Sequence, residues 1–340
     1  MAVRGQWVLA GGFAGGIAVG ALMLFLISRP PEGAMMPMGG LSQPAAVTIP
    51  FDPPMFAPLR YAYEMRTERD NGVQTIGSVD ELTFLPGAAG GYTLRWKTRS
   101  VSVDAPAPAR ALLTRTLRLT KAQPLLLGIS AQGVPVRILN EPKVRATADR
   151  MIARNGPAAE ADFADVPLEG RAAMRQMMAG IAKLQREQSR DAFAETMLEN
   201  PRLLLRNIGA LVPGVAVEAQ TEAASKVDQG RIRYRSRIEM RQYQPGKSVE
   251  VMISSVADAG DARRAMKAMI DPVLAAIPDP AQRQAAAARI ADMGEPIITD
   301  ESVLTIDLPS GLARSMVWRN QFYIPGRGST TETRSYRRLL

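Results

Sequence analysis

The chain begins with a short basic head, residues 1–6, followed by an apolar run from Trp7 to Ile27 that Arg29 closes. At about 1.5 Å of rise per residue, a helix of this length spans about 30 Å, the thickness of a bilayer's hydrocarbon core. A secretory signal peptide has a shorter core of about 7 to 15 apolar residues and a small-x-small cleavage site, which is lacking here. The pattern therefore predicts one transmembrane helix over residues 7–28, with a cleaved signal peptide as the alternative.

Charge placement around this run predicts its orientation. Arg4 and the α-amino group precede the run, whereas Arg29 is offset by Glu32. The positive-inside rule then predicts a single-pass protein of a bacterial inner membrane, with a cytoplasmic N-terminus and most of the chain in the periplasm. Glycines in overlapping G-x-x-x-G spacing favour a homodimer of such helices, although glycine is also common in membrane helices generally. These glycines are Gly11, Gly12, Gly15, Gly16 and Gly20.

A segment rich in proline, glycine and methionine, residues 29–58, follows the apolar run. Such a composition leans towards extended polyproline II structure and predicts a tether between the membrane and a folded domain at 59–340. Met35, Met36 and Met38 offer soft thioether ligands of the kind that suit copper(I). No histidine accompanies them, so we predict no metal site.

From Leu59 onwards, apolar and polar residues alternate in many segments, which is typical of half-buried antiparallel strands. In the first segment, Tyr61, Tyr63 and Met65 alternate with charged residues. Short turns rich in glycine, proline and asparagine separate neighbouring segments and predict hairpins. The predicted strands cover residues 59–69, 73–85, 92–99, 111–119, 128–139, 231–243, 248–256, 302–308, 313–324 and 330–339.

Apolar residues recur at helical spacing between the two groups of strands. One stripe is formed by Met174, Met177, Met178 and Ile181, and a second includes Met266 and Met269. Further helices are expected over 144–152, 200–208 and 281–293. Strands followed by helices, twice over and closed by strands, indicate the α+β class. We expect one curved antiparallel β-sheet of roughly eight or more strands, with helices packed on its concave apolar face.

The composition excludes several kinds of chemistry. Cysteine and histidine are both absent, which excludes disulfides, Cys/His and Ser-His-Asp catalysis, and histidine-ligated metals or haem. We therefore expect no cofactor. The net charge is +9. The predicted topology removes nucleic acid as a partner and leaves anionic envelope components, although arginine excess also follows genome composition.

One strand carries a row of arginines on a single face: Arg231, Arg233, Arg235 and Arg237. A row of guanidinium groups can bind phosphate or carboxylate groups bidentately, so one interpretation is an anionic-surface site. The other interpretation is a solvated outer face, whose arginines pair with acidic residues of neighbouring strands such as Glu64, Glu68 or Glu332.

No arrangement of residues predicts catalysis. Acidic pairs occur at Asp162 with Asp165 and at Asp300 with Glu301, and we interpret the second pair as turn residues before a strand. The glycine-rich loops lack the spacing and lysine of a phosphate loop. No catalytic residue is predicted, and an envelope hydrolase that uses carboxylates is the least favoured function.

A curved sheet whose concave apolar face is covered by methionine-rich helices predicts a cavity for a hydrophobic ligand, since methionine repacks easily around apolar groups. The candidate lining residues are Tyr61, Tyr63, Trp96, Met174, Met177, Met178, Ile181, Met266 and Met269.

The order of strands, covering helices and a closing meander that ends in Tyr336-Arg337-Arg338 resembles the half-barrel periplasmic carriers of lipids and lipoproteins of the LolA and LppX type. The resemblance extends over residues 59–340 and is one of layout, without a diagnostic motif. It implies a membrane-tethered module that binds a lipid or lipopeptide, whereas a permanent anchor departs from a diffusible carrier. The alternative is a tethered structural or protein-interaction domain of an envelope complex, with no ligand.

Overall fold

The computed structural model describes residues 46–69, 72–105, 123–150, 190–206, 208–224, 230–275, 279–291, 294–325 and 328–339, with the isolated positions 110, 113, 114, 117 and 121. The predicted transmembrane helix and the methionine stripe at 174–181 lie outside these residues. None of the helices within these ranges is both long enough and apolar enough to cross a membrane.

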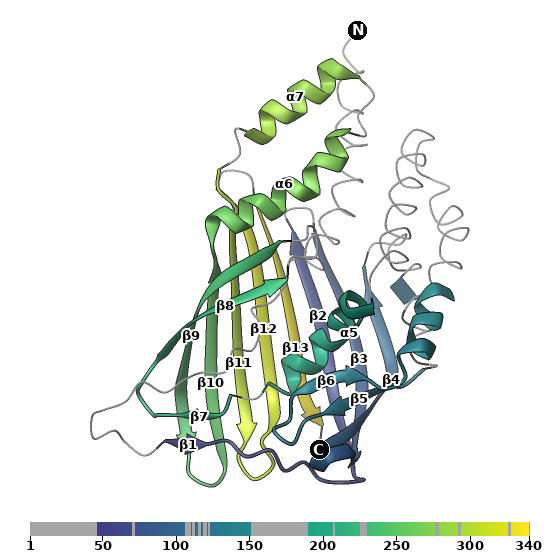
Figure 1. The fold of residues 1–340 in the computed structure, drawn as a ribbon, viewed down its shortest axis with the longest axis vertical. Coiled ribbons are helices and arrows are strands. Elements are labelled where there is room, and N and C mark those ends of the chain that lie inside the picture. The colour runs from purple at the N-terminus through teal and green to yellow at the C-terminus, as the bar shows by residue number, and fades with distance from the viewer. Residues whose placement is uncertain are drawn as a thin grey trace.

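The domain is built on one sheet of eleven antiparallel strands in the order β6-β5-β4-β3-β2-β13-β12-β11-β10-β9-β8 (Figure 1). Every neighbour in this order is also the neighbour in sequence, except at the pair β2–β13, where two meanders join. The strands are β2 (Pro58–Arg69), β3 (Gly72–Pro86), β4 (Tyr92–Asp104), β5 (Leu125–Ile129), β6 (Pro135–Ile138), β8 (Val217–Ala224), β9 (Arg231–Gln244), β10 (Ser248–Ala257), β11 (Ile297–Asp307), β12 (Leu312–Ile324) and β13 (Gly328–Leu339).

The prediction of a large antiparallel sheet with helices is confirmed. Strand β8 was not predicted, and β11 begins at Ile297, before the predicted start at residue 302. The predicted strand at 111–119 is wrong, because Leu113, Thr114 and Leu117 are helical. That segment alternates, but it is rich in leucine and arginine, which favour helix when no partner strand competes.

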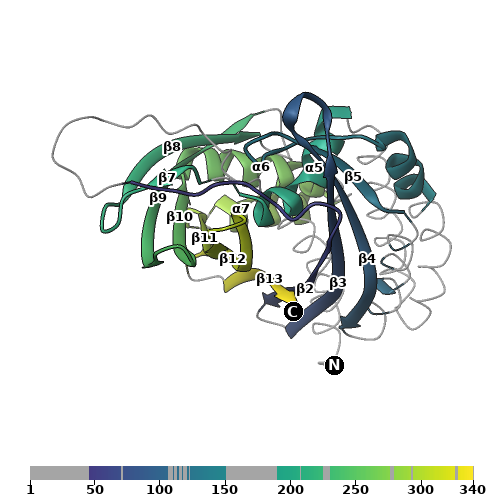
Figure 2. The same cartoon turned by 90° about the horizontal axis from the view of Figure 1, so that it is seen from below.

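The longer helices are α5 (Arg190–Leu204), α6 (Ala259–Ala275) and α7 (Pro280–Ala291); residues 141–150 are also helical, and a short 3-10 turn, η1 (Ala88–Gly90), precedes β4. Seen along the strands, the sheet curves around α5 (Figure 2). Helix α5 contacts β6 and β12, whereas α6 contacts β9 and β11. The helix predicted to restart at Pro201 is instead the last turn of α5, which passes through this proline.

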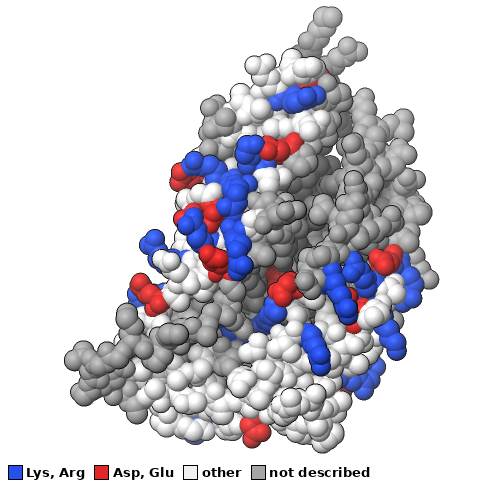
Figure 3. Space-filling model, viewed as in Figure 1, with Lys and Arg blue, Asp and Glu red and all other residues white. Residues whose placement is uncertain are grey.

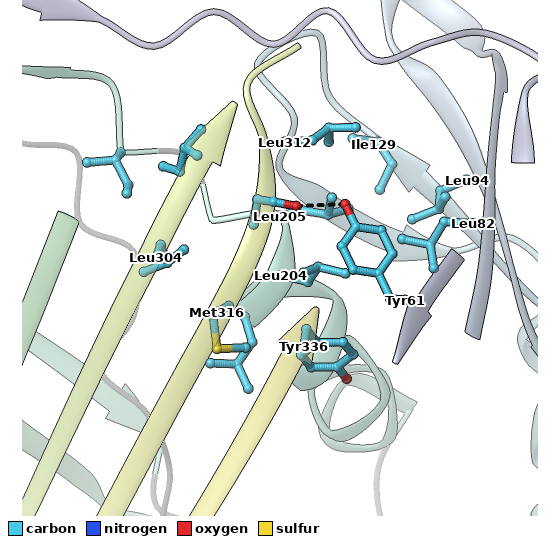
Figure 4. Close-up of a cluster of buried hydrophobic side chains, with 14 of the residues drawn as sticks. Tyr61, Leu82, Leu94, Ile129, Leu204, Leu205, Leu304, Leu312, Met316 and Tyr336 are labelled. Atoms are coloured by element: carbon cyan, nitrogen blue, oxygen red, sulfur yellow. Dashed lines mark hydrogen bonds between the residues drawn. The ribbon is translucent and has the colours of Figure 1, made fainter. Parts of the chain in front are cut away.

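The apolar core lies on the concave side, between α5 and the end of the sheet where the chain finishes (Figure 4). Leu204, the last residue of α5, and Leu205, which follows it, belong to a buried cluster that includes Leu82, Leu304 and Met316. The buried Tyr61 hydroxyl donates a 2.8 Å hydrogen bond to the carbonyl oxygen of Ala313. Burial raises the pKa of Tyr61 to about 12. This half of the concave side is therefore filled by the protein's own side chains.

A segment that we call the strap, residues 46–56, crosses this end of the sheet (Figure 2). Its strand β1 (Val47–Thr48) pairs with β7 (Ala210–Leu211), and the Ile49 N–H donates to the Gly209 carbonyl oxygen at 3.1 Å. The Phe51 ring packs edge-on against Phe84 and Tyr92, with centroids 5.9 and 5.4 Å away. Residues 46–56 were predicted to belong to the extended tether, but they pack against the domain, because their apolar side chains reach the open end of the core.

Candidate functional site

Six buried residues of the three neighbouring strands β11, β12 and β13 form what we call the polar block. The register places Glu332, Asn320 and Asp300 side by side in one row. The next row along the strands contains Arg334, Trp318 and Ser302. All six side chains lie on the concave face, and each residue is at most 4% exposed. Such a concentration of polar groups in a protein interior is costly unless the groups have partners.

Arg334 is the central cation of the block and is 2% exposed. Its Nε donates to Glu332 Oε1 at 2.6 Å, and its Nη1 donates to Glu199 Oε1 at 3.1 Å and Asn200 Oδ1 at 2.8 Å. The guanidinium carbon also lies 4.7 Å from the ring centroid of Trp318, a cation–π contact. Burial alone would lower the pKa of Arg334, but the two carboxylates raise it, so the group stays charged. Because Glu199 and Asn200 belong to α5, the same contacts fix that helix over the sheet.

The indole of Trp318 connects the cation to the third strand. Its Nε1–H donates a 2.6 Å hydrogen bond to Asp300 Oδ2. Asp300, which was interpreted as a turn residue, instead lies inside β11 with its side chain inward and 4% exposed. The block thus combines three carboxylates, counting Glu199 of α5, with one guanidinium.

Two neutral side chains of the block have no hydrogen-bond partner. The Oδ1 atom of Asn320 and the Oγ atom of Ser302 are both buried and unbonded within the described part of the chain. The Nη2 atom of Arg334 is also buried without a hydrogen bond, whereas its Nε and Nη1 atoms both donate. Asn320 is 4% exposed and Ser302 is 1% exposed. An unsatisfied buried polar group costs about 1–3 kcal/mol, so each of these side chains calls for an explanation.

Polar residues continue from the block on both sides, in the row of Asn320 and, at Thr221, in the adjacent row. On β10 and β9 the hydroxyls of Ser255 and Ser236 lie 2.9 Å apart, and Ser236 Oγ is 3.3 Å from Thr221 Oγ1 on β8. On β2 the register places Thr67 beside Glu332. The sequence predicted an apolar concave face. The structure instead has a buried polar band that crosses this face.

Apolar side chains border this band. In the row of Arg334, the register continues to Ile253 on β10 and to Met65 on β2. The next row towards the core contains Tyr336, Met316 and Leu304, all at most 1% exposed. The concave face thus has an amphipathic character, with a polar centre next to apolar surface.

The structure places the predicted lining residues in different settings. Tyr61 and Trp96 are buried in the core cluster, and Tyr63 packs on Tyr336 with ring centroids 4.7 Å apart, one row from the polar block. Met266 is buried on α6, at 7% exposure. The side chain of Met269 and the stripe Met174, Met177, Met178 and Ile181 lie outside the described residues. Tyr63 is thus the predicted residue that the structure brings nearest to the block.

The arginine row of β9 points away from the concave face, as predicted from its alternation with Ile232 and Tyr234. Figure 3 shows basic and acidic side chains interleaved along the side of the molecule where β8 and β9 lie. Arg231 pairs with Glu222 at 2.8 Å, Arg233 with Asp261 at 2.8 Å, and Arg237 with Glu239 at 3.2 Å.

The partners predicted for this row were wrong. Glu332 is buried with Arg334, and Glu68 pairs with Arg66. The actual partners come from the unpredicted strand β8, from helix α6 and from β9 itself, which lie beside the arginines in the fold. Of the four arginines, Arg235 has no ion pair within the described residues, so most of the row's charge is locally balanced.

Asp261 anchors α6 to this row. Arg233 donates to Asp261 Oδ2 from its backbone N–H and from Nε, and Arg264 donates to Oδ1. These hydrogen bonds, led by that of the Arg233 side chain, lower the pKa of Asp261 to about 2. Asp258 caps the same helix by accepting the Asp261 N–H at 3.1 Å.

Replacing Asp261 with asparagine is expected to lower the free energy of unfolding at pH 7 by about 1–2 kcal/mol, because a charge-assisted contact is lost. Since the pKa of Asp261 is lower in the folded state, its contribution is fully present above about pH 4 and disappears as the pH falls towards 2. Urea titrations at pH 7 and pH 2.5 would measure both effects. Asp271→Asn on the same helix, at an exposed pair with Lys267, should change stability by less than about 0.5 kcal/mol; an equal loss would contradict the anchoring role.

No arrangement in the described ranges points to a metal ion, because no three acidic side chains there lie close enough to hold one. The polar block was missed because it is assembled from strands whose sequence spacing says nothing about their register. The signal that could have revealed it was a polar residue at an inward position, such as Asn320 two residues after Trp318.

No family model and no curated protein matches the sequence. Among solved structures, the chain is similar to lipovitellin, from work on lipid–protein interactions, with a TM-score of 0.38 and 12% identity over 85% of this chain. It spans 25% of that lipovitellin chain. An outer membrane channel from Pseudomonas putida F1 matches with a TM-score of 0.17 and 8% identity, over 84% of this chain and 96% of the channel. Both similarities are too low to carry a functional argument, so the function is inferred from the site geometry.

Proposed function

We propose that this protein binds an amphiphilic, lipid-like ligand on the concave side of its sheet, as a domain tethered to the membrane by its N-terminal segment. The observation that carries the proposal is the polar block, whose Asn320 and Ser302 are buried without partners and bordered by apolar side chains. A ligand with a polar group and an apolar chain matches both parts of this face. Unpartnered buried polar groups are typical of sites where the sequence serves binding rather than stability.

The packing of α5 on the sheet also indicates which part of the concave face the ligand would occupy. The part of the concave side beneath α5 is filled by the core cluster, so a ligand is not expected there. The block lies one row further along the strands, and α5 reaches it through Glu199 and Asn200. The expected site is therefore the stretch of concave face beyond α5, with the polar block as its floor.

Lipid analysis of the purified full-length chain tests the proposal. Native mass spectrometry and solvent extraction should show a lipid bound in stoichiometric amount. Ser302→Trp, which places a large side chain over the block, should remove that lipid. Glu301→Trp, at the neighbouring exposed position on the opposite face of β11, should retain it and serves as a control for lipid around the membrane segment. Equal lipid content in the two variants and the wild type would favour the alternative, a tethered interaction domain.

A further inference from the structure

We infer that the polar block binds an uncharged, hydroxyl-rich head group, such as that of a glycolipid or an acylglycerol. This inference rests on the proposed function and specifies its ligand. It follows from which polar atoms of the block already have partners and which do not.

The charged groups of the block are engaged by one another. Arg334 donates to Glu332 and to Glu199, and Trp318 donates to Asp300. A cationic head group would have to compete with these short contacts. An anionic head group would enter a site with three carboxylates and one guanidinium, where like-charge repulsion and desolvation both oppose it.

The atoms of the block without a hydrogen bond are two neutral ones, Asn320 Oδ1 and Ser302 Oγ, and the donor Nη2 of Arg334. Asn320 lies between Glu332 and Asp300 in its row, and its Oδ1 can accept a hydrogen bond. Ser302 lies in the next row beside Trp318, diagonal to Asn320, and its hydroxyl can donate or accept. Diagonal neighbours on adjacent strands are about 7–8 Å apart at Cα, with closer side chains.

A head group with two or more hydroxyls matches this pair of side chains. Each hydroxyl carries one donor and two lone pairs, so one group can donate to Asn320 Oδ1 while its neighbour bonds Ser302. The binding of such a head group adds no net charge to the buried site. A hydroxyl oxygen can also accept from Arg334 Nη2, so such a head group offers a partner to all three block atoms that make no hydrogen bond.

Three probes with the same decyl chain test this inference: decyl glucoside, decyl phosphate and decyltrimethylammonium. The full-length chain is reconstituted in phosphatidylcholine nanodiscs, and saturable binding is measured against empty nanodiscs. Decyl glucoside should bind saturably, with the other two at least tenfold weaker. Preference for the phosphate or the ammonium probe would overturn the head-group inference and leave the proposed function standing. Absence of saturable binding for all three would count against the proposed function itself.

Two substitutions at neighbouring positions test whether the head group binds at Asn320. Asn320→Leu should weaken decyl glucoside binding about three- to tenfold, the worth of one neutral hydrogen bond. Gln321→Leu, the next residue on the opposite face of β12, should leave it unchanged. The melting temperature of ligand-free Asn320→Leu should not fall, because leucine removes a buried group that has no partner. Unchanged glucoside binding in Asn320→Leu, or a fall in its ligand-free melting temperature, would overturn the assignment to Asn320.

Discussion

Replacing Arg334 with methionine is expected to lower the free energy of unfolding by about 3–5 kcal/mol, because it leaves Glu332 and Glu199 as buried carboxylates without their cation. Arg334 is 2% exposed, and its contacts reach both the neighbouring position on β13 and the helix α5. Methionine retains much of the side-chain volume, so the loss reports the missing charge and not a cavity. Urea denaturation of the full-length protein, followed by far-ultraviolet circular dichroism, measures it.

Two further variants separate the ion pairs from packing. Arg319→Met, on the exposed face of β12, should change stability by less than about 0.5 kcal/mol. Adding Glu332→Leu and Glu199→Leu to Arg334→Met should recover most of the loss, since a buried ionic network and an apolar replacement often have similar stability. A triple variant no more stable than Arg334→Met would show that the cost does not come from the orphaned carboxylates.

This network also links the stability of the domain to its proposed site. The same guanidinium that holds Glu199 and Asn200 of α5 lies over the ring of Trp318, which in turn holds Asp300. The side chains around Asn320 and Ser302 are therefore fixed before any ligand arrives. Such preorganisation reduces the ordering that binding requires.

The strands could be predicted from the sequence because, within each strand, the alternation of apolar and polar residues shows which side chains are buried. On β9 the inward Ile232 and Tyr234 are 1% and 2% exposed and alternate with exposed arginines, as their pattern indicated. The hairpins could be predicted from glycines in the turns between strands. Gly133, between β5 and β6, and Gly246, between β9 and β10, adopt the positive φ angles that such turns require. Both features are local, so one sequence suffices.

The parts that were missed depend on distant partners. The polar block depends on the register that aligns Asn320 with Glu332 and Asp300, and on Glu199 and Asn200 of the distant helix α5, which accept from Arg334. The strap was interpreted as tether because its prolines argue against regular structure, whereas its Phe51 finds Phe84 and Tyr92 only in the folded domain. Strand β8 was missed since its alternating side is formed by small residues, Ala219 and Ala223 among them.

The contact between the strap and Gly311 is expected to contribute strongly to the free energy of unfolding. Gly311→Ala should lower the free energy of unfolding by about 2–4 kcal/mol, from two sources. Gly311 has a φ of +68°, where alanine costs about 1–2 kcal/mol. A Cβ atom at this position would also overlap with the carbonyl oxygen of Pro50, so the strap would have to move away from the turn between β11 and β12. This movement breaks the hydrogen bond from the Asp52 N–H to the Ser310 carbonyl oxygen.

Gly246→Ala is the matched control, because Gly246 has the same φ of +68° but no atom within 4 Å of the position that a Cβ atom would take. It should show the backbone cost alone, about 1–2 kcal/mol. Limited proteolysis distinguishes the variants further, since displacement of the strap should expose residues 46–56 to cleavage in Gly311→Ala only. If the two variants lose equal stability and are cleaved alike, the strap does not stabilise the domain at Pro50. A larger loss in Gly311→Ala, with cleavage confined to the strap, would show that the strap closes this end of the core and stabilises the domain.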